Sequence, residues 1–117
     1  MNSLLLTFAQ TFAANREAQP VDGDYYELPG TVVYHTTTQK LPEKSRLEVN
    51  TITPEAADRF AWQAEITLNN KVNGDFIHVI IRTDGSAEET YGKTVTPVDA
   101  AREREILDAF EAALALI

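Results

Sequence analysis

Residues 59–70, with the sequence RFAWQAEITLNN, alternate apolar and polar side chains. One set of alternate positions is apolar: Phe60, Trp62, Ala64, Ile66 and Leu68. The other set is mostly polar: Ala61, Gln63, Glu65, Thr67 and Asn69. Successive side chains of a β-strand point to opposite faces, so a period of two indicates a strand. The segment therefore predicts a sheet with one face on the core and the other toward solvent.

A hairpin is predicted to follow this strand. Asn73-Gly74 has the composition of a two-residue type I′ turn, whose central residues both need positive φ. Such a turn pairs Val72 with Asp75. The same register predicts three further pairs: Leu68 with Val79, Ile66 with Ile81, and Glu65 with Arg82. The opposite charges of Glu65 and Arg82 support this register.

His78 lies in the second strand of this hairpin, within the sequence FIHVIIRTDG. The core side of the strand is predicted to consist of Ile77, Val79 and Ile81. His78 therefore points to the opposite side, together with Phe76 and Ile80. A histidine on a strand face is more often a half-buried structural residue than a catalytic one, and the same holds for His35 in VVYHTTT.

The position of Tyr91 depends on the turn at Asp84-Gly85. A two-residue turn places Tyr91 opposite His78, and this is the alternative we favour. A three-residue loop with a bulge instead turns Tyr91 toward the core, because a slip of one residue exchanges the two faces.

Helical patterns are predicted at both ends of the chain. The first is an apolar stripe at helical spacing formed by Leu4, Leu5, Phe8 and Phe12. The second begins at Thr96, Pro97 and Asp99. The polar first turns of this second helix, residues 99–105, are expected to be solvated. Between the helices, Thr53-Pro54 predicts one further helical turn.

The predicted fold class is α+β, in a single domain spanning residues 1–117. The expected architecture is a two-layer sandwich with an N-terminal helix, a four- to five-stranded antiparallel meander and a C-terminal helix. One core is expected from both helices and the sheet. Its predicted members are Trp62, Ile66, Leu68, Val79, Ile81, Phe8, Ile106, Phe110 and Leu114.

The chain contains 18 acidic and 10 basic residues, for a net charge of -8. This charge argues against binding to nucleic acid or to an anionic membrane, which needs a positive surface. No run of apolar residues reaches the roughly 20 residues of a membrane span. The first residues lack the basic region of a secretion signal, so a cytoplasmic protein is expected.

Motifs for catalysis and cofactor binding are missing from the sequence. There is no cysteine and no Gly-rich phosphate loop, so no cofactor and no metal site are expected. Asp22 and Asp24 are spaced like the first two ligands of a calcium loop, but Tyr26 occupies the next ligand position.

Two classes of function remain. The first is a noncatalytic protein-interaction module, such as an adaptor, inhibitor, immunity-type or phage-accessory protein. It would bind another protein or a second copy of itself, as a homodimer, through the sheet face that carries Phe76, His78, Ile80 and Tyr91. The alternative is a small ligand-binding domain or enzyme with a pocket between a curved sheet and the helices, where His78 or His35 acts as acid or base. The apolar residues of the face that carries Phe76 and Ile80 could instead be scattered singly, or covered by residues 22–29.

Overall fold

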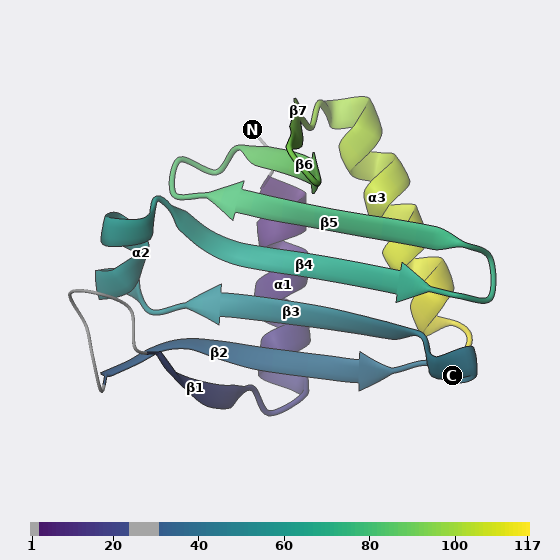
Figure 1. The fold of residues 1–117 in the computed structure, drawn as a ribbon, viewed down its shortest axis with the longest axis horizontal. Helices are drawn as coiled ribbons and strands as arrows, with labels where there is room; N and C mark the ends of the chain where they lie inside the picture. Colours follow the sequence, from purple (N-terminus) through teal and green to yellow (C-terminus); the bar gives the residue numbers. More distant parts are fainter. Residues whose placement is uncertain (1–2, 24–30) are drawn as a thin grey trace.

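The structure is a computed structural model that describes residues 3–23 and 31–117 (Figure 1). Three α-helices are described: α1 (Ser3–Asn15), α2 (Pro54–Phe60) and α3 (Ala100–Leu114). A short 3₁₀ helix covers Pro42–Lys44. The strands are β1 (Gln19–Gly23), β2 (Thr31–Lys40), β3 (Arg46–Ile52), β4 (Trp62–Asn70), β5 (Asp75–Arg82), β6 (Ala87–Tyr91) and β7 (Thr94–Pro97).

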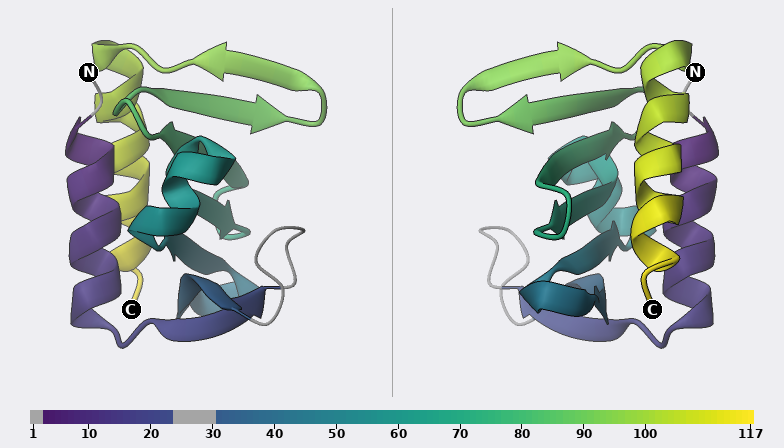
Figure 2. Two further views of the ribbon diagram at one scale, coloured as in Figure 1. Left: turned by 90° about the vertical axis from the view of Figure 1, so that its left-hand side faces the viewer. Right: turned by 90° about the vertical axis from the view of Figure 1, so that its right-hand side faces the viewer.

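The strands form one antiparallel sheet of seven strands in the order of the chain. Helices α1 and α3 lie side by side on one face of this sheet (Figures 1 and 2). The structure therefore confirms an α+β fold with a helix at each end of an antiparallel sheet. The predicted count of four to five strands was too low. The two missed strands, β1 and β7, are the edge strands, and each contains a proline, which weakens any strand prediction.

The core lies between the sheet and the two long helices. Six of the nine predicted core residues belong to its buried cluster: Ile66, Leu68, Val79, Ile81, Ile106 and Phe110. Phe8 and Leu114 are partly buried and pack against this cluster. The ring of Phe8 contacts that of Phe110, with centroids 5.1 Å apart. Eight of the predicted residues thus lie in or against the core, and Trp62 does not belong to the cluster.

A bulge at the start of β4 explains the position of Trp62. Trp62 pairs with Arg82 but Ala64 pairs with Ile81, so Gln63 is an extra residue in β4. The extra residue reverses the alternation of side chains before Ala64. Trp62 therefore lies on the same side of the sheet as Arg82, opposite to the buried Ala64. Phe60 was also misplaced, because helix α2, predicted as one turn, extends through Phe60.

The predicted register of the β4–β5 hairpin is wrong by two residues. Leu68 pairs with Ile77 rather than Val79, and Asn70 pairs with Asp75. The connection is thus a four-residue loop, 71–74, instead of a two-residue turn. Because the shift is even, the faces stay as predicted, and His78 lies on the side opposite Val79. Glu65 pairs with Ile80 across the two strands, and not with Arg82.

The β5–β6 connection follows the alternative that we did not favour. Ile81 pairs with Ala87, and the N–H of Arg82 donates to the carbonyl of Ser86, so residues 83–85 form a three-residue loop. Tyr91 therefore shares its side of β6 with the buried Ala87 and Glu89. The register instead brings Thr90 opposite His78.

Helices α1 and α3 run in the same direction, with their N-terminal ends next to each other (Figure 1). Asp99 caps α3 by accepting a hydrogen bond from the N–H of Arg102 at 2.8 Å, whereas Thr96 and Pro97 belong to β7. The prediction of solvated first turns is wrong for Glu103, which is buried. Its carboxylate accepts a hydrogen bond from the N–H of Leu5, at 3.4 Å, in the first turn of α1. A negative group there stabilises the positive N-terminal ends of both helices.

Candidate functional site

The outer face is the face of the sheet opposite α1 and α3. In Figure 2 the two helices lie on one side of the sheet, and the β6–β7 hairpin projects toward the other side. The strand registers assign these described side chains to the outer face: Gln19, Val21, Tyr34, Thr36, Thr38, Lys40, Arg46, Glu48, Asn50, Ile52, Trp62, Glu65, Thr67, Asn69, Phe76, His78, Ile80, Arg82, Glu88, Thr90, Val95 and Pro97. Most of them are polar, as expected for a sheet face without a helical layer.

Five of these side chains form a continuous hydrogen-bonded chain, which we call the polar row: Thr36, Asn50, Glu65, His78 and Thr90. The hydroxyl of Thr36 donates to Asn50 Oδ1 at 2.7 Å, and Asn50 Nδ2 donates to Glu65 Oε1 at 2.7 Å. His78 Nε2 lies 2.7 Å from Glu65 Oε2, and His78 Nδ1 is hydrogen-bonded to the hydroxyl of Thr90. The polar row crosses strands β2 to β6.

The hydrogen bonds of the polar row converge on Glu65. An ionised carboxylate only accepts hydrogen bonds, so the proton between Glu65 and His78 is on Nε2. In the neutral imidazole, Nδ1 is then an acceptor, and the hydroxyl of Thr90 donates to it. The direction of donation is thus Thr36 to Asn50 to Glu65 from one side. From the other side it is Thr90 to His78 to Glu65 when the imidazole is neutral, whereas a protonated imidazole donates to both Thr90 and Glu65.

The central pair of the polar row is half-buried. The side chains of His78 and Glu65 are 25% and 29% exposed. Each is held by two neighbours, so their orientations are fixed without any ligand. Thr90, His78 and Glu65 are also hydrogen-bonded in the same spatial order as the nucleophile, the base and the orienting acid of hydrolases.

The structure brings only part of the predicted binding residues together. Phe76, His78 and Ile80 share the outer face, and Phe76 is 49% exposed. Ile80 is paired with Glu65 on β4 and with Glu88 on β6, so polar side chains flank it. Tyr91 faces the other side of its strand. Residues 24–30, which belong to the segment that could cover this face, lie outside the described residues.

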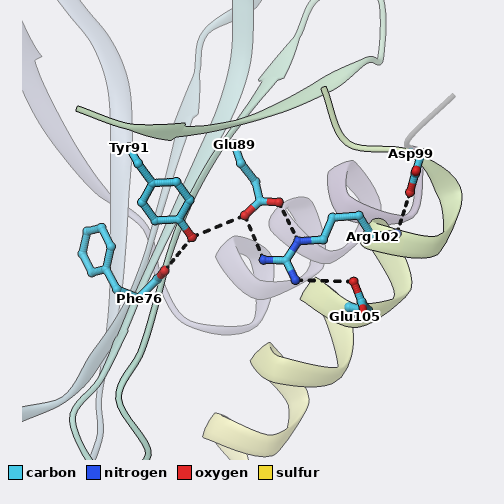
Figure 3. A network of polar contacts seen from close by, with 6 residues as sticks. All are labelled: Phe76, Glu89, Tyr91, Asp99, Arg102 and Glu105. Atoms are coloured by element: carbon cyan, nitrogen blue, oxygen red, sulfur yellow. Dashed lines mark hydrogen bonds and ion pairs between the residues drawn. The ribbon is translucent and has the colours of Figure 1, made fainter. Parts of the chain in front are cut away.

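Tyr91 belongs to a second polar cluster at the edge of the helical layer (Figure 3). Its hydroxyl donates to the carbonyl of Phe76 at 2.8 Å and lies 3.4 Å from Glu89 Oε2. Burial, together with the Glu89 carboxylate, raises the pKa of Tyr91. Glu89 is paired with Arg102 of α3, whose hydrogen bonds lower the pKa of Glu89. The hydrogen bonds to Glu89 raise the pKa of Arg102 in turn.

His35, the other predicted acid or base, is not part of the polar row. It pairs with Thr51 of β3, and both lie on the side of the sheet that faces the helices. The two histidines therefore lie on opposite faces of the sheet and belong to different environments.

Sequence reasoning missed the partners of His78 in the polar row. Thr36, Asn50, Glu65 and Thr90 are unremarkable in sequence, and only the register of neighbouring strands brings them together. The incorrect β4–β5 register assigned Glu65 to Arg82, which hid its contact with His78. A correct register would have identified the polar row.

Charged residues flank the polar row on the outer face. Glu88 is paired with Arg82, with 2.6 Å between Arg82 Nη2 and Glu88 Oε1. Lys40 and Arg46 lie at the far ends of β2 and β3, where they pair with each other across the two strands.

Residues 3–23 and 31–117 contain no pocket and no cluster of three or more groups suited to a metal ion. Within the same residues, no helix has the length and apolar character needed to cross a membrane. No protein-family model, curated protein or solved structure matches the chain.

Proposed function

We propose that this protein is a noncatalytic interaction module that binds a protein partner, another protein or a second copy of itself, through its outer face. The observation that carries the proposal is the polar row, a set of hydrogen-bonding side chains that is already oriented on a face without a helical layer. Preorganised groups lose little side-chain entropy when a partner binds. The exposed Phe76 beside them adds apolar contact area.

The proposal is tested by one substitution in the outer face with a matched control. Ile80→Glu adds a charge between Glu65 and Glu88, where the partner would lie, and should abolish partner binding. Leu4→Glu makes the same chemical change at an exposed position of α1, on the other side of the molecule, and should leave binding intact.

The measurement is capture of partners from a lysate of the host by the tagged protein and by both variants. Circular dichroism of each variant establishes that it is folded. Equal partner recovery by wild type and Ile80→Glu would refute a role for the outer face.

A second candidate is a hydrolytic enzyme, favoured by the order of Thr90, His78 and Glu65. In that role the hydroxyl oxygen of Thr90 attacks the carbonyl carbon of an ester, its proton passes to His78 Nδ1, and Glu65 stabilises the resulting imidazolium. His78 then gives this proton to the departing alcohol as the ester C–O bond breaks, and water hydrolyses the acyl group left on Thr90. Hydrolysis of an activated ester by the wild type but not by Thr90→Val would support this function. Equal rates for the two proteins would exclude it.

A further inference from the structure

We propose that the partner of the outer face is a basic, extended protein segment, and that its lysine or arginine side chains bind at Glu65. This inference rests on the proposed function, and names the chemistry of the partner. It follows from the direction of the hydrogen bonds in the polar row, from the charge around Glu65 and from the spacing of side chains along β5.

The polar row has a surplus of hydrogen-bond acceptors. The hydroxyl of Thr36 uses its only proton inside the row, so its oxygen keeps only acceptor capacity. Glu65 accepts one bond at each carboxylate oxygen and has further lone pairs. The free donor is the second amide hydrogen of Asn50. A partner that complements this row must therefore supply N–H or O–H donors.

Charge selects a cationic donor. Within the described residues, the basic side chain that contacts the Glu65 carboxylate is the imidazole of His78, with 2.7 Å between Nε2 and Oε2, and no lysine or arginine pairs with it. The nearest basic side chain along β5, Arg82, is already paired with Glu88. The whole chain carries a net charge of -8, which attracts basic partners from a distance. A second copy carries the same -8 and is repelled.

The spacing along β5 suits an extended segment. Phe76, His78 and Ile80 occupy alternate positions of one strand, so their side chains are about 7 Å apart. Alternate side chains of an extended segment that runs along β5 have the same spacing. One basic side chain would reach Glu65 beside His78, and a neighbouring one would lie over the ring of Phe76, where a cation is also favoured. This path runs two strands away from Arg46, which lies level with Phe76 across Asn69 of β4.

The test uses two short peptides with capped ends, Lys-Ser-Leu-Ser-Lys and Glu-Ser-Leu-Ser-Glu, titrated into the full chain and followed by NMR. The basic peptide should shift amide signals of β4, β5 and β6 around Glu65 and His78, and the acidic peptide should not. Raising the salt concentration should weaken the binding, because the interaction is between charges.

Two variants that each remove one negative charge distinguish an effect of the Glu65 site on binding from an effect of the net charge of the chain. Glu65→Gln should weaken binding about tenfold, the effect of losing a hydrogen bond to a charged group. Glu111→Gln, at an exposed position of α3, should leave it close to wild type. Thr36→Val removes only one acceptor at the end of the polar row, and should weaken binding less than Glu65→Gln does.

Three results would overturn the inference. They are equal affinities for Glu65→Gln and Glu111→Gln, equal binding of both peptides, and a concentration-dependent dimer, seen by sedimentation, that shields the outer face. In each case the proposed function would still stand if Ile80→Glu lost its captured partner. If Ile80→Glu kept all partners while the basic peptide bound at Glu65, the proposed function would fail by itself.

Discussion

The carboxylate of Glu89 on β6 receives two hydrogen bonds from the guanidinium of Arg102 on α3, from Nε at 2.6 Å and from Nη2 at 2.9 Å. The side chain of Glu89 is only 8% exposed, whereas that of Arg102 is 37% exposed. A nearly buried carboxylate is thus satisfied by one arginine. The pair joins the first turn of α3 to a strand near the edge of the sheet.

Removing the arginine should destabilise the protein. Arg102→Met keeps much of the apolar stem but leaves the Glu89 carboxylate buried without its two donors. We expect a loss of about 1–3 kcal/mol in the free energy of unfolding, measured by urea denaturation. As a control, Glu105→Gln removes only an exposed contact of 3.5 Å to Arg102 and should cost less than about 0.5 kcal/mol. A loss for Arg102→Met no larger than that of the control would contradict the structural role of the pair.

The same pair predicts how stability depends on pH. The hydrogen bonds from Arg102 lower the pKa of Glu89 below its ordinary value of 4.5. The ionised form is therefore favoured by folding, and its contribution is complete above pH 4.5 and is lost as the pH falls through the lower folded pKa. The difference in unfolding free energy between wild type and Glu89→Gln should be constant from about pH 6 to 8 and should shrink toward about pH 3. A difference that does not change with pH would show that Glu89 is not held as an ion.

The face of each central strand could be predicted from the sequence, because alternation depends only on the strand itself. Ile66 and Leu68 are buried on β4, and Val79 and Ile81 are buried on β5, as their spacing predicts. Helix α3 was also predicted, and Asp99 caps it.

The connections between strands could not be predicted in the same way. Asn73-Gly74 suggested a two-residue turn, but the buried Asn70 accepts a hydrogen bond from the N–H of Val72 and supports a longer loop. The hydroxyl of Ser45, far away in sequence, accepts from the N–H of Lys71 in the same loop. Such a tertiary contact is invisible to local turn propensity. The polar row depends on these registers, and was therefore missed.

Two substitutions test the core. Ile66 on β4 and Phe110 on α3 are both fully buried and lie in one cluster. Ile66→Ala and Phe110→Ala should each lower the free energy of unfolding by about 2–5 kcal/mol, because each leaves a cavity. Chemical denaturation measures both. Losses below about 0.5 kcal/mol at both positions would mean that the core is built from the other face of the sheet.

One buried hydroxyl predicts a substitution that stabilises the protein. Thr37 lies on the inner side of β2, 3% exposed, and its Oγ1 has no hydrogen-bond partner within the described residues. Burying a hydroxyl without a partner costs about 1–3 kcal/mol. Thr37→Val keeps the β-branched shape that suits a strand and replaces the hydroxyl by a methyl group.

Thr37→Val should therefore raise the free energy of unfolding by about 1 kcal/mol, with a higher midpoint of thermal unfolding. Thr38→Val, on the outer side of the same strand, is the matched control. Its side chain is exposed, so water already satisfies the hydroxyl, and stability should change by less than about 0.5 kcal/mol. If Thr37→Val destabilised the protein instead, the hydroxyl of Thr37 would have to form a hydrogen bond in solution, for example to a buried water molecule.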